Sequence, residues 1–390
     1  MKRILISAGE ASGELYAVGL MRAIKKRIPD VEFFGVGGEA MRAAGCDIVV
    51  ESKHLSVVGI TEIVSHLPRL YGEFRKLIRE ADRRKPDAAI VIDSPAFNFK
   101  VARELNARGV PVIYYVVPQL WAWRERRIAR FHKWIKKALV IFPFEEQWYR
   151  ERGVDAEFAG HPLAELPPPS ITREAYAAKY KLDPKMEWVA LLPGSRKKEV
   201  AMNLQALCVA AIATSVASAS RSNPAGKYQF ILAVAPTLDE AWVAQELGVL
   251  TRIPVILAED APAALHFSRA AVVASGTATV QAALAGCPFV IVYRVSPLTW
   301  KVGRGLLKVP YVGMPNLIAG RKIVPELLQD DFTPENVAKE LRPLLEDTPE
   351  RERMVKDLAE VKERLQAGPH SGVPAADRAA EAVIRTLGWA

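Results

Sequence analysis

Short apolar runs alternate with longer amphipathic stretches along the whole chain. In the first part the runs RILIS, AAIVID (88–93) and VPVIYYVV (110–117) are rich in Val and Ile and show no polar alternation. Strands of this kind are buried on both faces, which is typical of a parallel sheet covered by helices. The pattern therefore predicts an α/β fold with a doubly wound parallel sheet.

A proline-rich stretch then interrupts the alternation. HPLAELPPPS (161–170) has four prolines in ten residues, and such a segment cannot continue a helix or a central strand. The alternation resumes after it with WVALLPGSR, YQFILAVAP, AAVVASGT and PFVIVYR. Because 390 residues exceed one ordinary core, we predict two Rossmann-like domains, 1–165 and 166–368, facing each other across a cleft.

Composition narrows the cellular setting. The cysteines, Cys46, Cys208 and Cys287, are far apart and form no CxxC or Cys/His cluster, so neither disulfides nor structural zinc is indicated. The chain has no run of 18 or more apolar residues, and its first apolar run is too short for a signal-peptide core. These features favour a cytoplasmic protein without a membrane span.

The chain has a net charge of +9, and two of its segments are rich in basic residues. The run 124–137 has seven basic residues and one acid, and the segment 55–80 combines helical apolar spacing with several cations. The run is explained by a solvated helix face, and its alternative is a patch that meets phosphates, either of nucleic acid or of anionic lipid. The segment is explained by a helix packed on its own core, and its alternative is a helix that lies at a membrane surface.

The residues that follow the strands are the candidates for ligand binding, because ligands of open α/β sheets bind beyond the carboxyl ends of the strands. PGSR (193–196) and SGT (275–277) are small-residue turns between a strand and a helix, where backbone N–H groups favour phosphate. Ser195, Ser275 and Thr277 are equally explained as helix N-caps. Two such turns together with Arg196 favour a diphosphate site.

Two carboxylates follow strands in the first domain. Asp93 ends an apolar strand, where partial burial would raise its proton affinity and suit a general base. An N-cap role for Asp93 is equally compatible with the sequence. Glu10 lies in the turn Gly9–Gly13 and would accept hydrogen bonds from hydroxyls, which suggests a sugar ligand.

The WAWR stretch (121–124) leaves two interpretations open. Its tryptophans precede the basic run directly, so they would form either core packing or an apolar wall beside cations, suited to an amphipathic anion.

Several common nucleotide motifs are missing from the sequence. GxGxxG, GxxxxGK[ST] and Asp-x-Asp do not occur, which counts against a dehydrogenase, a P-loop ATPase and a metal-dependent transferase. We therefore expect neither a cofactor nor a metal.

A set of motifs in a fixed order resembles the lipid-A-disaccharide synthase family. They are AGEASGE, VVGITE, IDSPAFN, PQLWAWR, FPFE, GHP, LLPGSR, SGTAT and PYVGMPNLIAGR, spread from Ile4 to about Leu328. The resemblance implies an inverting, metal-independent glycosyltransferase of the two-Rossmann, GT-B type. It would join UDP-2,3-diacylglucosamine to 2,3-diacylglucosamine 1-phosphate, giving the β-1′,6-linked disaccharide 1-phosphate and UDP.

The resemblance also implies where the reaction takes place. The enzyme would be peripheral on the cytoplasmic face of the inner membrane, contacting it through 55–80 and 124–137, and the final helix (369–390) would pack back on the first domain. It would bind no nucleic acid, and homo-oligomerisation stays open.

Site residues follow from the matching motifs. Asp93 matches the family's candidate base, and Glu10 and Ser12 match its acceptor-side residues. The donor side is matched by Ser195, Arg196, Ser275, Gly276, Thr277 and Asn316. The sequence departs from the family pattern at Glu14, where Asp is expected, and at Gln281, where Glu often binds the donor ribose.

Three other functions share some of these features. Another GT-B enzyme with a UDP-N-acetylglucosamine-type donor and a sugar-nucleotide epimerase would have the same fold. A basic nucleic-acid-binding protein would share the charge and the paired tryptophans.

Overall fold

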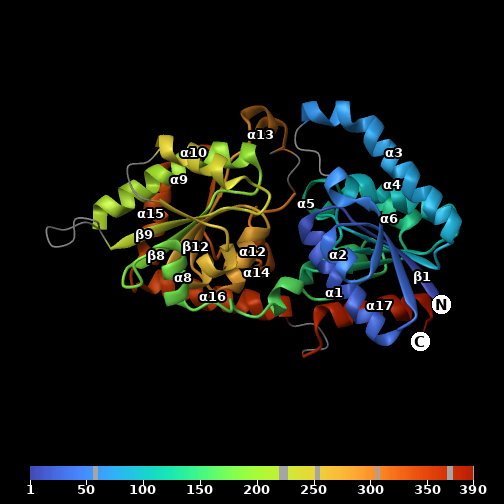
Figure 1. Ribbon diagram of the computed structural model, residues 1–390. Coiled ribbons are helices and arrows are strands. Elements are labelled where there is room, and N and C mark those ends of the chain that lie inside the picture. The colour runs from blue at the N-terminus through green and yellow to red at the C-terminus, as the bar shows by residue number, and fades with distance from the viewer. Residues whose placement is uncertain are drawn as a thin grey trace. The chain divides into compact units, whose positions relative to one another are not determined.

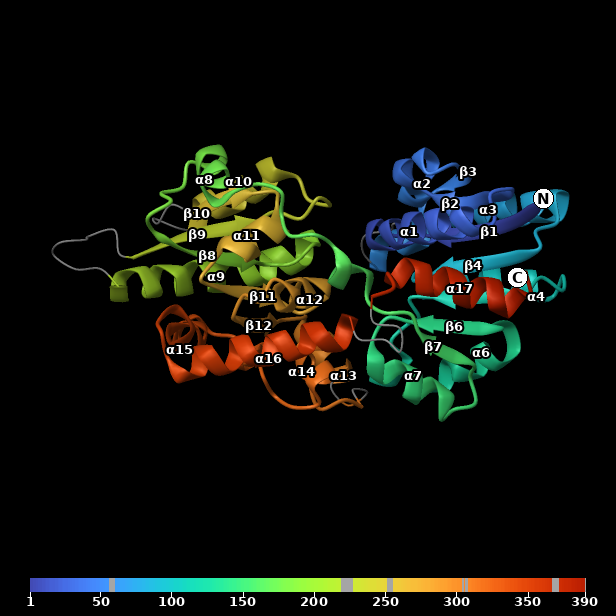
Figure 2. The same cartoon turned by 90° about the horizontal axis from the view of Figure 1, so that it is seen from below.

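The chain forms two compact units in a computed structural model, which describes residues 1–55, 60–218, 227–250, 255–303, 305, 308–366 and 372–389. Unit 1 contains Met1–Glu165 and Leu365–Ala390, and unit 2 contains Leu166–Arg364. Unit 1 is therefore assembled from both ends of the chain, and the chain returns to it at Leu365, slightly before the predicted residue 369. Helices cover both faces of each sheet (Figures 1 and 2).

Unit 1 is built on a seven-stranded sheet in the order β3-β2-β1-β4-β5-β6-β7. Every neighbouring pair is parallel. The strands are β1 (Lys2–Ala8), β2 (Val31–Gly37), β3 (Cys46–Glu51), β4 (Ala88–Ile92), β5 (Val112–Tyr115), β6 (Lys137–Val140) and β7 (Ala156–Phe158). The uninterrupted apolar runs are thus buried parallel strands, as the sequence predicts.

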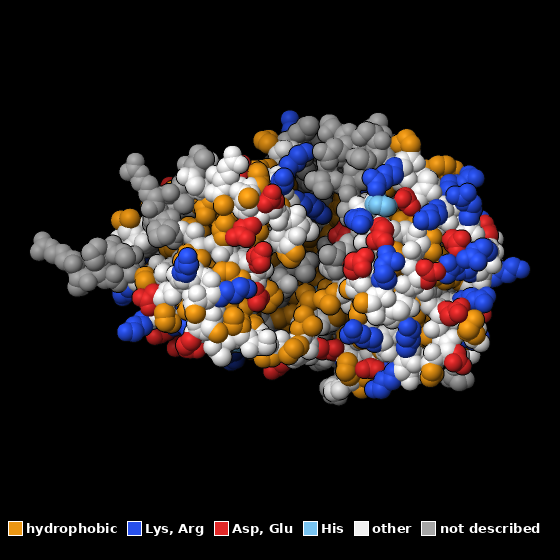
Figure 3. All heavy atoms as spheres, viewed as in Figure 1, with side chains coloured by type: hydrophobic (Ala, Val, Ile, Leu, Met, Phe, Trp, Pro, Cys, Tyr) orange, Lys and Arg blue, Asp and Glu red, His pale blue; other side chains and the backbone are white. Residues whose placement is uncertain are grey.

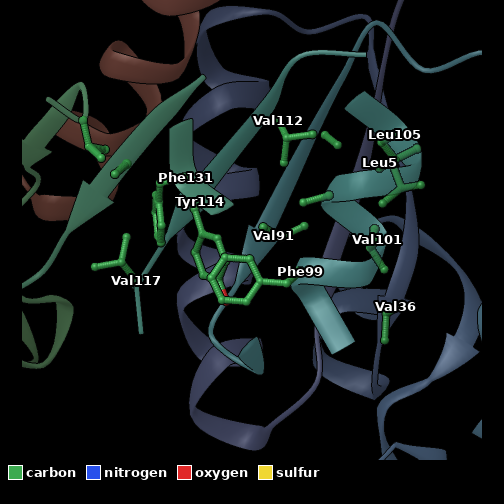
Figure 4. Packing of buried hydrophobic residues seen from close by; sticks show 14 of the residues in the cluster. Leu5, Val36, Val91, Phe99, Val101, Leu105, Val112, Tyr114, Val117 and Phe131 are labelled. Carbon is green, nitrogen blue, oxygen red and sulfur yellow. The ribbon is translucent and has the colours of Figure 1, made fainter. Parts of the chain in front are cut away.

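The helices of unit 1 pack in two layers. They are α1 (Ala11–Arg27), α2 (Glu39–Ala43), α3 (Ile60–Arg84), α4 (Pro95–Asn106), α5 (Leu120–Trp123), α6 (Ile128–Trp134), α7 (Pro143–Arg150) and α17 (Ala375–Leu387), with 3₁₀ turns at Ser52–His54, Glu125–Arg127 and Pro162–Glu165. On one face α1 lies beside α17. On the other, Phe99 of α4 and Phe131 of α6 pack with Val91 and Tyr114 of the sheet (Figure 4).

Helix α17 is fixed to unit 1 by a buried arginine. Arg378 donates from Nε to the carbonyl oxygen of Ala159 (2.8 Å) and from Nη2 to Glu165 (3.4 Å). A Cβ at Gly160 would lie 1.7 Å from the Arg378 guanidinium, so only glycine leaves room for it. The GHP motif is thereby tied to the last helix of the chain.

Unit 2 is built on a six-stranded sheet in the order β10-β9-β8-β11-β12-β13, again parallel throughout. Its strands are β8 (Glu187–Leu192), β9 (Tyr228–Ala233), β10 (Val255–Ala258), β11 (Ala270–Ala274), β12 (Phe289–Tyr293) and β13 (Glu326–Leu328). Its helices are α8 (Arg173–Tyr180), α9 (Lys197–Ser218), α10 (Glu240–Leu250), α11 (Ala261–Phe267), α12 (Thr277–Leu284), α13 (Pro297–Gly303), α14 (Met314–Ala319), α15 (Pro334–Leu345) and α16 (Pro349–Gln366), with a 3₁₀ turn at Gln329–Asp331.

Helix α9 is the one helix in the described ranges long and apolar enough to cross a membrane, by length and composition only. It connects the paired strands β8 and β9. Val200, Leu204 and Cys208 lie on its buried side and pack with strand β9 and helix α10. These contacts identify α9 as a core helix of unit 2.

Candidate active site

The first candidate site lies at the carboxyl end of the unit 1 sheet. Strands β1 and β4 are neighbours, with Ala8 paired to Ile92, so the turns that follow them lie together. A Cβ at Gly9 would come within 2.5 Å of Ser94 Oγ. The two turns are therefore in contact, and the sheet brings Glu10 and Asp93 to the same edge.

The turn after β1 is shorter than predicted. Helix α1 already begins at Ala11, so Ser12 and Gly13 belong to its first turn. Gly13 packs flat on the end of β4, where an added Cβ would lie 3.6 Å from Ile92 Cγ2. Glu10 occupies the N-cap position without a side-chain cap bond, and both Glu10 and Ser12 are exposed. Their polar groups are thus available to a ligand.

Asp93 is half-buried directly after β4. Burial, and secondarily the nearby Glu10 charge, raises the pKa of Asp93 to about 6, while the Ser94 N–H acts in the opposite direction. The N-cap residue of α4 is Ser94, and that helix has no side-chain cap bond. The N-cap interpretation of Asp93 is therefore wrong, and helix α4 does not use its carboxylate as a cap.

The two tryptophans of WAWR have different environments. Trp121 is buried and donates its indole N–H to Glu145 Oε1 (2.9 Å). Trp123 is 45% exposed, and the guanidinium of Arg124 lies 3.6 Å from its ring centroid. Core packing thus describes Trp121, whereas Trp123 and Arg124 form an exposed apolar and cationic tip.

Glu145 of the FPFE run was not singled out by the sequence. It is buried, accepts hydrogen bonds from Trp121 and from the Phe142 N–H, and burial raises its pKa to about 7. A sequence signal existed in its position three residues after an N-cap, but its tryptophan partner lies 24 residues away.

The basic run 124–137 is not one helix face. It passes through a 3₁₀ turn, helix α6 and the first residue of β6. Lys137 is buried and paired with Asp155 and Glu157 (2.8 and 3.0 Å). Arg127 lies close enough to Arg124 and Arg130 that burial and these two charges lower its pKa. Arg124, Arg127 and Arg130 are therefore three neighbouring cations of unit 1.

The segment 55–80 is described only in part. Residues 56–59 lie outside the described residues, and helix α3 runs from Ile60 with Pro68 inside it. Farther along it, Tyr71 is 60% exposed and Arg83 and Arg84 pair with Glu80. Acidic and basic side chains are interspersed over unit 1 in Figure 3, so part of its positive charge is compensated locally.

The second candidate site lies at the carboxyl end of the unit 2 sheet. The PGSR turn follows β8, and Ser195 and Arg196 are exposed there. The Ser195 N–H donates to Glu199 Oε2 (2.9 Å), so this N–H is not free for a phosphate. Arg196 has no hydrogen-bond or ion-pair partner within the described ranges, which leaves its guanidinium available for an anion.

The neighbouring turn follows β11. Gly276 adopts a φ of 146° as N-cap of α12, and Thr277 begins that helix at an exposed position. Ser275 donates to the Val312 carbonyl oxygen (3.4 Å) and does not cap the helix. The first N–H groups of α12 are thus open at the same sheet edge. Gln281 lies one turn farther along α12, half-buried, with no side-chain partner in the described part of the chain.

Tyr293 is the last residue of β12 and Arg294 follows it, and the two side chains have separate roles. Burial raises the pKa of Tyr293, with the Glu199 charge acting in the same direction and Arg196 against it, so its hydroxyl lies near both. Arg294 donates to the carbonyl oxygen of Phe332 and stacks on that ring. Arg294 therefore holds the loop after β13, and Tyr293 joins the candidate site.

No group of three or more His, Cys, Asp or Glu side chains suited to a metal occurs in the parts of the chain that the structure describes.

Comparison with known proteins decides the family. The family model described as lipid-A-disaccharide synthetase matches residues 4–377. Lipid-A-disaccharide synthase of Koribacter versatilis is 55% identical over 98% of both chains. That of Acidobacterium capsulatum is 46% identical over 98% of this chain and 96% of its own length. The chain belongs to the lipid-A-disaccharide synthase family. It is accordingly an enzyme, a glycosyltransferase that forms the lipid A disaccharide.

Solved structures agree with the fold expected of this synthase family. A calicheamicin glycosyltransferase, CalG4, aligns with a TM-score of 0.58 at 18% identity, covering 100% of this chain and 98% of the other. The glycotransferase of kitacinnamycin aligns at 0.63 and 17%, covering 99% of each. The predicted GT-B class of two doubly wound α/β domains is confirmed.

Asn316, expected on the donor side of the synthase, has a different environment. Its side chain is fully buried, donates to the Val324 carbonyl oxygen and Glu326 Oε1, and accepts from the N–H groups of Ile323 and Val324. All of its hydrogen-bonding capacity is used within unit 2. A direct contact with a ligand would require breaking these bonds, so Asn316 fixes α14 and the following loop.

Glu14, one of the two departures from the family pattern, has a structural role. Its Oε1 accepts the N–H of Met41 (3.1 Å) in the first turn of α2. The longer Glu side chain thus connects the helix after β1 to the helix after β2.

Proposed function

We propose that this synthase transfers the sugar of UDP-2,3-diacylglucosamine to 2,3-diacylglucosamine 1-phosphate with inversion, and that Asp93 is the general base. The carboxylate would take the proton of the acceptor 6-hydroxyl. The resulting oxygen would bond to the donor's anomeric carbon as the bond to UDP breaks and UDP leaves with the electron pair. The products would be the β-1′,6-linked disaccharide 1-phosphate and UDP.

The half-buried Asp93 carboxylate is the observation that carries this proposal. Partial burial raises its pKa to about 6, which keeps it ionised at neutral pH yet more basic than an exposed aspartate. Glu10 and Ser12 stand exposed at the same sheet edge. Their oxygens suit the hydroxyls of an acceptor sugar.

The donor diphosphate would bind at the unit 2 sheet edge. Arg196 is exposed and has no partner among the residues that the structure describes, and the open N-terminus of α12 at Ser275, Gly276 and Thr277 adds N–H donors. Both would stabilise charge on the leaving UDP, a task that metal ions perform in other transferases. Gln281 would hydrogen-bond the ribose through its amide, which has no partner in the described part of the chain.

A membrane-surface contact would bring the enzyme to its acylated substrates from the cytoplasmic side. The exposed tip of Trp123 and Arg124 adjoins the cations of the 124–137 run, a combination that suits an anionic bilayer surface. The test is sedimentation with phosphatidylglycerol vesicles. The double variant Arg126→Glu/Lys133→Glu should bind less, and Lys356→Glu/Lys362→Glu on α16 should bind as wild type. Equal binding by both variants would reject this surface.

The decisive test of the reaction uses both acylated glucosamine substrates and a chelator, with disaccharide and UDP detected by mass spectrometry. Asp93→Asn should retain UDP binding and lose turnover. Asp87→Asn, an exposed position just before the same strand, is the matched control and should remain active. Unchanged turnover of Asp93→Asn would reject the base, and equal use of an unacylated acceptor would reject the lipid specificity.

A further inference from the structure

The backbone at Asp93 adopts a conformation that side chains disfavour. Asp93 and Ser94 have φ values of 49° and 44°, both in the left-handed region. Two consecutive non-glycine residues rarely adopt this conformation, because Cβ then crowds the backbone. Such a pair persists only where surrounding contacts impose it.

A buried polar network supplies these contacts. Asn98 Nδ2 donates to the carbonyl oxygens of Ile92 (2.9 Å) and Asp93 (2.7 Å). The Tyr114 hydroxyl donates to the same Asp93 oxygen (2.7 Å). The Ser7 hydroxyl donates to Asn98 Oδ1 (2.7 Å), which orients the amide with its N–H groups toward the carbonyls. Ser7, Asn98 and Tyr114 are all fully buried.

The network is itself fixed by apolar packing. The Tyr114 ring lies 5.6 Å, centroid to centroid, from both Phe99 and Phe131, and Figure 4 shows these three rings packed close to one another. This packing therefore fixes the Tyr114 hydroxyl of strand β5 beside the Asp93 carbonyl oxygen. None of the three side chains hydrogen-bonds the Asp93 carboxylate, so they hold its backbone without stabilising its charge.

We infer that Ser7, Asn98 and Tyr114 are positioning residues that hold Asp93 in its left-handed conformation and thereby aim its carboxylate. The inference rests on the proposed role of Asp93 as general base. Asn98 connects the main chain to the helix that follows it, and Tyr114 connects it to the neighbouring strand. Loss of either donor lets the Asp93 peptide relax and moves the carboxylate away from the acceptor hydroxyl.

Tyr114→Phe and Tyr115→Phe form a matched pair of test variants. Both residues are buried on β5, but the Tyr115 hydroxyl has no hydrogen-bond partner among the described residues. A misplaced catalytic group commonly costs one to two orders of magnitude in rate, so we expect Tyr114→Phe to lower kcat roughly 10- to 100-fold. The donor KM should stay at its wild-type value, and Tyr115→Phe should retain wild-type kcat. Thermal melts confirm that each variant is folded at the assay temperature.

A rescue separates positioning from general loss of structure. Ser94 makes no cap hydrogen bond, and glycine adopts positive φ freely. Ser94→Gly in the Tyr114→Phe background should therefore recover part of the lost kcat, whereas a mere packing defect would not be relieved. Equal kcat in Tyr114→Phe and Tyr115→Phe, with Asp93→Asn inactive, would overturn the positioning inference alone. An active Asp93→Asn would overturn the base proposal together with it.

Discussion

Asp93 shows how one carboxyl group is adapted by its surroundings. Burial is the larger cause of its raised pKa of about 6, and the Glu10 charge is the smaller one. A general base works only when deprotonated, so we expect kcat to fall as the pH drops below about 6. The acid limb of the kcat–pH profile measures this directly.

A Glu10 variant tests how much the Glu10 charge contributes to the raised pKa of Asp93. Glu10→Gln removes the negative charge, so the acid limb should move to lower pH, by less than the whole shift because burial remains. A limb that stays in place, or that moves to higher pH, would exclude coupling between these two carboxyl groups.

The buried Glu145 makes the unfolding free energy of the protein depend on pH. Its pKa is raised by burial from 4.5 to about 7, so the folded state binds the proton more tightly than the unfolded state. The contribution of Glu145 to the unfolding free energy is fully present below pH 4.5 and is lost as the pH rises toward 7. We expect the unfolding free energy of wild type, measured relative to Glu145→Gln, to drop by about 3 kcal/mol between these limits. Urea denaturation at pH 5 and pH 8 tests it, and a constant difference would contradict the assignment.

At the scale of elements, the docking of α17 depends on Arg378. Its guanidinium is buried against the Ala159 and Val373 carbonyl oxygens and Glu165. Arg378→Met leaves these groups without their partner and should destabilise unit 1 by about 3 kcal/mol.

Arg385→Met is the matched control for this prediction. Arg385 lies on the same helix, and its ion pair with Glu157 is 61% exposed on the arginine side. Its loss should cost about 0.5 kcal/mol. Equal melting temperatures for the two variants would show that α17 docks without Arg378.

Elements were more predictable than turns. The β1, β4 and β5 runs are buried on both faces, and uninterrupted apolar sequence specifies this directly. The turn after β1 was mispredicted because Gly13 serves close packing on Ile92 inside a helix and does not lengthen the loop. Lys137 was assigned to a basic surface, but it pairs with Asp155, just before strand β7, and with Glu157, within β7.

The candidate site was predictable only where a residue acts alone. Asp93 and Arg196 each follow a strand, and a parallel sheet places such residues at its carboxyl edge, here the edge of a different sheet for each residue. The partners of Asn98 and Asn316 are set by the folded chain: Ser7 lies 91 positions from Asn98. The sequence shows that an amide side chain stands at each of these positions. The fold determines whether that side chain binds a ligand or hydrogen-bonds the protein's own backbone.

At the scale of the whole molecule, donor binding should stabilise the protein. A ligand at 100 times its dissociation constant adds about 2.7 kcal/mol to the unfolding free energy, so UDP should raise the melting temperature. Arg196→Ala should need more UDP for the same increase, whereas Arg353→Ala, an exposed arginine on α16, should behave as wild type. Identical UDP titrations for both variants would remove Arg196 from the donor site.

The split composition of unit 1 has a consequence for biosynthesis. Residues 166–364 complete unit 2 as one continuous segment, but unit 1 also needs Leu365–Ala390. During translation unit 2 can thus finish folding first, although its codons come later than those of β1. Unit 1 can complete its fold only after helix α17 has been synthesised.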